Sequence, residues 1–153
     1  MNTLINSINA VITDVSVLDA SVSSSPKPED ARHLASASLT CDKPEIRVSD
    51  GLVSVAAVTG LDVSASLDDG GDPFFSCGIS VGCTVACPEG QGGKEIDELA
   101  KKLREYAVSV SIGYAREIIR SECLRSSAKT DLIIPPFDVA DVLTALDTAD
   151  EEQ

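Results

Sequence analysis

The side chains that could carry chemistry are few in this chain. It has one histidine, His33, and five cysteines among 153 residues. A histidine can act as a general base, but nucleophilic catalysis also needs a serine or cysteine beside it and an acid to orient it. His33 lies in a polar stretch, and no neighbouring motif supplies that pair. We therefore interpret it as a surface histidine.

Three of the cysteines, Cys77, Cys83 and Cys87, fall close together. Their spacing, C-x5-C-x3-C, differs from the C-x2-C pairs that bend a chain around zinc. They also share one face of an alternating apolar segment, where cysteine packs as a small hydrophobic residue. We predict that they belong to the core, and we expect no metal site and no cofactor.

The glycine-rich stretches and the paired acids also give no catalytic motif. Neither Gly70-Gly71 nor the stretch 90–93 has a nucleotide-binding glycine pattern. Lys94, after two glycines and before a predicted helix, fits an anion site or a loop leaving a sheet, and we favour the loop. Asp68 and Asp69 lie in a turn, where aspartate forms local hydrogen bonds. We therefore expect no enzyme activity.

The charge excludes some partners. The chain has 25 acidic and 12 basic residues and a net charge of −13. Nucleic acids and anionic membranes bind clusters of Lys and Arg, so neither is expected as a partner. The stretch 1–7 lacks the features of a signal peptide, and no apolar run approaches the about 18 residues of a membrane span. We expect a cytoplasmic protein with reduced cysteines.

The first part of the chain has the two-residue periodicity of strands. Residues 53–67 and 75–87 alternate apolar and small or polar side chains, with a turn sequence at 68–73 between them. An earlier strand is predicted over about 10–17, and another between Leu34 and Val48, bent at Pro44. The stretch 21–30 is interpreted as a polar loop. Together these predict a four-stranded antiparallel sheet with one apolar face.

The second part has helical periodicity, so the fold class is α+β: the sheet is followed by a long helix and a shorter C-terminal helix. The long helix is predicted over 95–125, with Lys101, Lys102 and Arg104 on its polar side. Its apolar stripe is longer than one small sheet can cover, which predicts packing against another copy of the chain. The residues expected at that interface are Tyr106, Val110, Tyr114 and Arg116.

The C-terminal helix is predicted to begin after an Asp138 N-cap, with Phe137 and Val142 as a hydrophobic staple. Four acids and no base follow Leu146. We expect residues 1–146 to form a single domain and residues 147–153 to form an acidic, solvated tail.

Two segments of the second part resemble the SecB family of protein-export chaperones. Gly113–Ile119 (GYAREII) resembles the P-Y-A-R-E-x-I motif of the family's long helix. Leu132–Asp138 (LIIPPFD) resembles the L-x-L-x-P-V-N-F-D/A motif before its last helix. Two upstream segments, Thr13–Val17 and Phe75–Ile79, are similar to its first-strand and fourth-strand segments. The resemblance therefore extends over nearly the whole chain in order.

The resemblance implies a four-stranded sheet under two helices, assembled as a dimer of dimers. It further implies ATP-independent holding of unfolded proteins or preproteins, and delivery to the export motor SecA. Asp14 matches an acid of the family's first strand, which makes it a candidate for docking to the motor; a solvated strand face is the alternative. Gly78 stands where the family has an acid in its fourth strand. Divergent relatives serve toxin–antitoxin systems, so an antitoxin is the other expected partner.

A surface that holds unfolded chains needs more exposed apolar area than a monomer normally leaves uncovered. The bulky candidates for client contact are Phe74, Phe75, Leu132, Ile133 and Ile134, with core packing as the alternative for each. Two other functions fit the same fold. One is a dedicated adaptor for a single partner such as an antitoxin, and the other is a small-ligand-binding domain with a pocket between sheet and helices.

Overall fold

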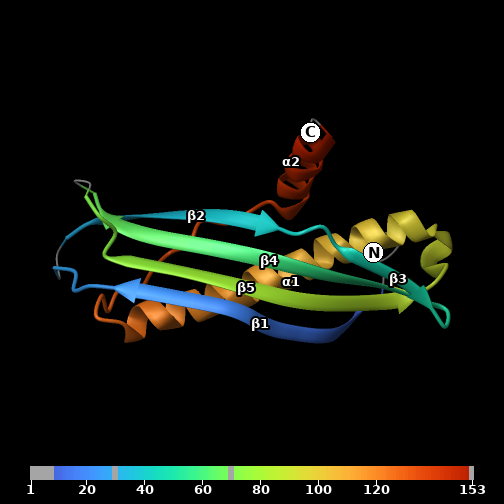
Figure 1. The fold of residues 1–153 in the computed structure, drawn as a ribbon, viewed down its shortest axis with the longest axis horizontal. Coiled ribbons are helices and arrows are strands. Elements are labelled where there is room, and N and C mark those ends of the chain that lie inside the picture. Colours follow the sequence, from blue (N-terminus) through green and yellow to red (C-terminus); the bar gives the residue numbers. More distant parts are fainter. Residues whose placement is uncertain (1–8, 29–30, 69–70, 152–153) are drawn as a thin grey trace, which may run out of the picture.

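A computed structural model describes residues 9–28, 31–68 and 71–151. Strands come first and helices after, which confirms the predicted α+β class (Figure 1). The strands are β1 (Val11–Ser24), β2 (His33–Cys41), β3 (Glu45–Ser49), β4 (Leu52–Leu67) and β5 (Phe75–Pro88). A short 3-10 turn, η2 (Gln91–Gly93), then leads to the helices α1 (Ile96–Arg125) and α2 (Val139–Glu151).

The sheet is antiparallel, in the order β1-β5-β4-β2. Both β2 and β3 pair with β4, β2 along residues 59–67 and β3 along residues 52–56. The two segments therefore fill one strand position, which is interrupted around Pro44, a residue with no N–H to donate. The four predicted strand positions are confirmed, but the strand predicted between Leu34 and Val48 is divided into β2 and β3, so the sheet has five strands.

Strand β1 is longer than predicted. It continues to Ser24 and pairs with β5 as far as Phe75, so the loop predicted over 21–30 was wrong for residues 21–24 and is confirmed for residues 25–28. Backbone hydrogen bonds to β5 hold this polar stretch in the sheet. Register shifts next to Asp14 and Asp19 also interrupt the alternation of side chains between the two faces. The two-residue periodicity therefore did not reveal the second half of β1. Residues 29–30 of the predicted loop and 69–70 of the predicted turn lie outside the described residues.

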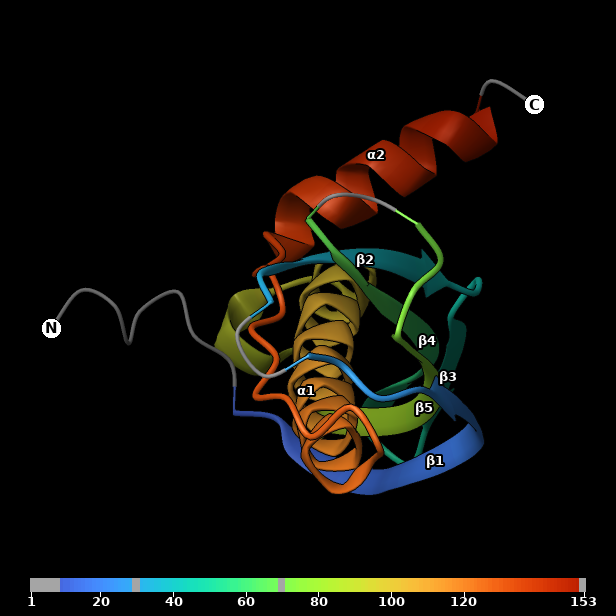
Figure 2. The ribbon, with the colours of Figure 1, turned by 90° about the vertical axis from the view of Figure 1, so that its left-hand side faces the viewer.

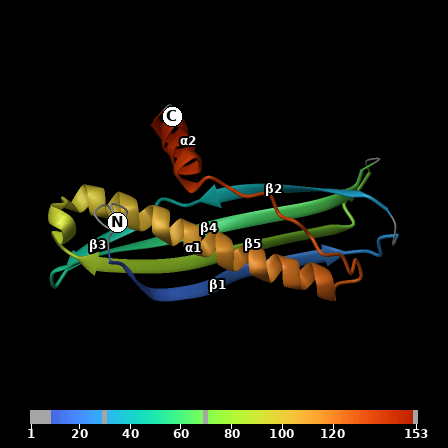
Figure 3. The same cartoon turned by 180° about the vertical axis from the view of Figure 1, so that it is seen from behind.

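The core lies between one face of the sheet and α1, which crosses that face diagonally (Figure 3). The alternation predicted for the two central strands is confirmed, because their apolar positions are buried under the helix. The largest fully buried side chains are Phe75, Leu61, Leu99, Leu103, Ile119, Leu132, Ile134, Val53, Val55, Val81, Val85 and Val108.

A segment without regular secondary structure, residues 129–137, returns across the same face of the sheet to reach α2 (Figure 3). We call it the crossing segment. It buries Leu132 and Ile134 against β4 and β5. Arg116 of α1 donates a hydrogen bond of 2.6 Å from Nη2 to the Ile134 carbonyl, and Arg120 pairs with Asp131 at 3.0 Å. The crossing segment thus covers the part of the sheet that α1 leaves open.

Helix α2 projects from the body of the molecule (Figure 2). The Asp138 carboxylate accepts a hydrogen bond of 3.1 Å from the Asp141 backbone N–H, which confirms the predicted N-cap. Leu143 is the buried residue of the helix. The helix continues to Glu151, into the stretch expected to be a solvated tail, whereas residues 152–153 lie outside the described part of the chain.

Candidate functional site

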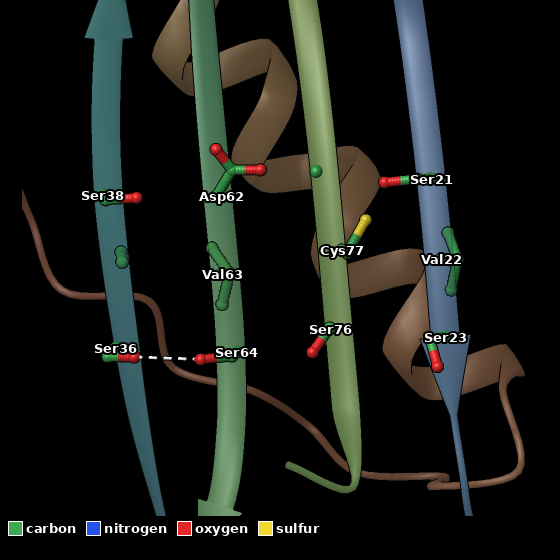
Figure 4. Close-up of a pocket in the computed structure, with 12 residues that line it drawn as sticks. Ser21, Val22, Ser23, Ser36, Ser38, Asp62, Val63, Ser64, Ser76 and Cys77 are labelled. Carbon is green, nitrogen blue, oxygen red and sulfur yellow. Dashed lines mark hydrogen bonds between the residues drawn. The ribbon is translucent and has the colours of Figure 1, made fainter. Parts of the chain in front are cut away.

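The two faces of the sheet differ in chemistry. The face turned away from α1 carries many small and hydroxyl side chains. A hollow of about 460 Å³ lies on this face and is lined by residues of β1, β5, β4 and β2 (Figure 4). Its hydroxyl groups come from Ser21, Ser23, Ser36, Ser38, Ser64 and Ser76. A hydrogen bond of 3.0 Å joins the Ser36 and Ser64 hydroxyls. The hollow therefore offers hydrogen-bonding groups, whereas elsewhere on the same face Leu18 and Leu34 expose apolar side chains.

One carboxylate lies in the hollow. Asp62 of β4 is the register partner of Gly78 of β5, and its carboxylate occupies the space that a Cβ at position 78 would need (Figure 4). A side chain at position 78 would displace the Asp62 carboxylate, so the glycine leaves room for it. The sequence suggested that an acid was missing at Gly78, but the structure places an acid over this position from the neighbouring strand.

Three acidic side chains of this face form no ion pair within the described part of the chain. Asp14 and Asp19 are exposed on β1, and neither they nor Asp62 forms an ion pair with another described residue. Their register partners, Thr84 and Ser80, belong to the same hydroxyl-rich face. The face can accept cationic groups of a partner at its surface.

The side of the sheet that carries α1 leaves apolar area uncovered. Ile12, Val17 and Val22 pair with β5 residues that are buried under α1, yet they remain 40%, 42% and 45% exposed. Tyr106 and Tyr114 on α1 are also exposed. We call Ile12, Val17 and Val22 the apolar flank. Strand β1 is in addition an edge strand, with unpaired backbone groups along its outer side.

The structure separates the predicted client contacts. Four of them are buried in the core and cannot touch another chain in this conformation: Phe74, Phe75, Leu132 and Ile134. For these four, the alternative of core packing is correct. Ile133 is 82% exposed. The reason is the extended shape of the crossing segment, in which consecutive side chains point to opposite sides.

The residues predicted at an interface between copies also differ in placement. Tyr106 and Tyr114 lie on the outer side of α1, with the partly buried Val110 between them. Arg116 instead turns toward the crossing segment and bonds the Ile134 carbonyl, so it serves a contact within the chain. The long apolar stripe that suggested an interface is therefore partly used inside the monomer and partly exposed.

The reactive side chains are placed as core or surface groups. The His33 ring meets the Phe74 ring edge-on, with centroids 5.9 Å apart. Cys77, Cys83 and Cys87 are buried, as predicted, and burial raises the pKa of the Cys77 thiol to about 11. Within the described ranges, no group of three or more His, Cys, Asp or Glu side chains could hold a metal ion. No helix in those ranges is long and apolar enough to cross a bilayer.

Neither a family model nor a curated protein matches this sequence. Among solved structures, the fold is similar to that of the Rv1957 SecB-like chaperone from Mycobacterium tuberculosis, solved in complex with a ChAD peptide from the Rv1956 HigA1 antitoxin. The TM-score is 0.52 at 13% sequence identity, and the match covers 84% of this chain and 91% of the other. The resemblance to SecB suggested by the sequence is thus confirmed at the level of the fold.

Proposed function

We propose that this chain is an ATP-independent chaperone that binds extended segments of unfolded polypeptides. The observation that carries the proposal is the apolar flank, which a chain with a SecB-like fold leaves uncovered beside a free edge strand. Soluble monomers seldom expose contiguous apolar area without a partner for it. An unfolded chain offers both complements, since it presents apolar side chains and unpaired backbone groups.

The charge of the chain favours a class of clients. With a net charge of −13, it attracts polypeptides with basic stretches and repels acidic ones at low ionic strength. Ile133 adds an exposed apolar contact next to two exposed prolines. The other bulky residues of the crossing segment contribute by holding Ile133 in place, because they anchor the segment to the sheet.

The proposal includes self-assembly, as a dimer of dimers, in the cytoplasm. Tyr106, Val110 and Tyr114 form an outward stripe on α1 that a second copy can cover with the same residues. Replacing Tyr114 by serine removes apolar area from that stripe at an exposed position, so it should lower the mass of the assembly in solution without unfolding the chain. An unchanged mass would exclude this stripe as the interface.

Two partners other than general clients are supported by particular observations. An antitoxin is one, because the structurally similar chaperone was solved with an antitoxin peptide. The export motor SecA is the other, because Asp14 and Asp62 place unpaired carboxylates on the open face of the sheet. Purification of the chain with its bound proteins separates these possibilities: many unfolded chains indicate a generalist, and one stoichiometric partner indicates a dedicated adaptor.

The direct experiment measures binding of a fluorescently labelled, permanently unfolded polypeptide by anisotropy, without nucleotide. Val17→Ser and Val22→Ser should each weaken binding, since both side chains lie on the apolar flank. Ser36→Ala, on the opposite face of the sheet, is the matched control and should leave binding unchanged. Equal affinities for all four proteins would contradict the proposed surface.

A further inference from the structure

A cavity of about 550 Å³ lies where the end of β2 meets α1 and α2. It is lined by Cys41, Lys43, Pro44, Arg104, Leu146 and Asp147. A smaller cavity of about 230 Å³ lies against α1 and α2 and shares Arg104 and Asp147 with the first. The ion pair between these two residues is therefore a boundary of both cavities, and α2 leaves open space on either side of it.

The Arg104 guanidinium is largely buried, but few of its N–H groups have a hydrogen-bond partner among the described residues. Its side chain is 16% exposed, and Nη1 donates a hydrogen bond of 2.9 Å to Asp147 Oδ1. Its Nε is fully buried and has no hydrogen-bond partner among the described residues. A guanidinium carries five N–H donors in a fork that matches a carboxylate. Asp147 itself is 56% exposed, and within residues 139–148 of α2 only Leu143 is buried.

The side chains that line the two cavities have a small excess of positive charge. Burial raises the pKa of the Cys41 thiol, although the Arg104 charge opposes this, so the thiol is neutral at pH 7. Lys43 lines the larger cavity, and Lys101 and Glu105 line the smaller one. The residues that line the two cavities thus carry three basic groups (Lys43, Lys101 and Arg104) and two acidic ones (Glu105 and Asp147), and the Asp42 carboxylate lies close enough to Cys41 to act on its thiol.

We propose that the cavity between β2, α1 and α2 binds a ligand carboxylate, with Arg104 and Lys43 as its cationic contacts and Pro44 and Leu146 as its apolar wall. In the structure, the Asp147 carboxylate takes the place of the ligand carboxylate beside Arg104. Because α2 buries little area against the rest of the molecule, Asp147 can move away from the Arg104 guanidinium when a ligand carboxylate binds there. This site does not depend on the proposed chaperone function.

The test follows the Arg104 Nε–H signal by nuclear magnetic resonance in the full chain, at constant ionic strength. Succinate is the first probe, and succinamide is its neutral counterpart. A second pair of probes, N-acetyl-Leu-Glu-amide and N-acetyl-Leu-Gln-amide, presents the carboxylate on a peptide. We expect saturable shifts with succinate and the Glu peptide only. Tighter binding of the Glu peptide would identify a polypeptide as the source of the carboxylate, and tighter binding of succinate a free acid.

Two variants distinguish a ligand site from an ion pair that is only structural. Asp147→Asn removes the internal competitor and should raise the affinity for the acidic probes about two- to fivefold, as expected for one exposed charge pair. Asp131→Asn, in the separate Arg120 pair, is the control and should change nothing. The proposal is overturned if the signal does not saturate, if the neutral probes act equally, or if Asp147→Asn leaves the affinity unchanged or lowers it.

Discussion

Adjacent isoleucines in the crossing segment provide a matched pair for testing how this segment is held. Ile134 is 2% exposed and packs in the core, whereas Ile133 is 82% exposed. Both are β-branched residues in the same extended segment, so intrinsic conformational preferences largely cancel when each is replaced by alanine. Any difference between the two variants therefore reports burial.

The expected magnitude follows from the atoms removed. Ile134→Ala deletes Cγ1, Cγ2 and Cδ1, which at about 0.8 kcal/mol per buried carbon group corresponds to about 2.4 kcal/mol of transfer free energy. The cavity left behind raises the cost to about 3–4 kcal/mol, inside the usual range for such substitutions. Ile133→Ala should change the free energy of unfolding by less than about 0.5 kcal/mol, as most surface substitutions do.

The assay is urea unfolding followed by circular dichroism at one fixed protein concentration, because self-association makes stability depend on concentration. With an m-value of about 2 kcal/mol per molar, Ile134→Ala should lower the midpoint by about 1.5–2 M. Ile133→Ala should leave the midpoint in place. Equal shifts for the two variants would refute the placement of the crossing segment on the sheet.

Three further predictions concern α2 and the buried thiols. Asp138→Ala removes the N-cap and should cost α2 about 1 kcal/mol, which would be seen as lower helicity at 222 nm; unchanged helicity would show that the cap is dispensable. In the folded chain at pH 8, Cys41 should react with a thiol reagent before the four buried cysteines, and equal rates for all five would contradict their burial. The fold raises the pKa of Cys77 from 9.0 to about 11, so its stabilising contribution is complete below pH 9 and is lost as the pH rises toward 11. Cys77→Ala should flatten the dependence of unfolding free energy on pH in that window, and an unaltered slope would argue against the shift.

Periodicity predicted the two central strands well because each has one face fully buried. Val53 and Val81 are both inaccessible to solvent, and their neighbours on the other face are small or polar. Strand β1 was only half recognised, since its register shifts interrupt the alternation and backbone pairing to β5 needs no apolar side chain. In such an edge strand, the hydrogen bonds decide the structure and leave little trace in the sequence.

The candidate sites were predicted less completely, because they depend on contacts between distant residues. Asp62 lies over Gly78 because the two residues are register partners on β4 and β5. Predicting that contact would have required the register of the two strands, which the sequence does not provide. Arg104 was assigned to the polar side of its helix, but α2 and the end of β2 enclose it. The alternation of Leu132, Ile133 and Ile134 was visible in the sequence, yet which of them faces the sheet was not.

The most direct test of the central claim is light scattering from an aggregating client, unfolded in denaturant and diluted into buffer without nucleotide. We expect a stoichiometric amount of this chain to suppress the scattering, and Val17→Ser and Val22→Ser to suppress it less well than the Ser36→Ala control. Scattering that remains unchanged at a severalfold excess of the folded chain would contradict the proposed chaperone function.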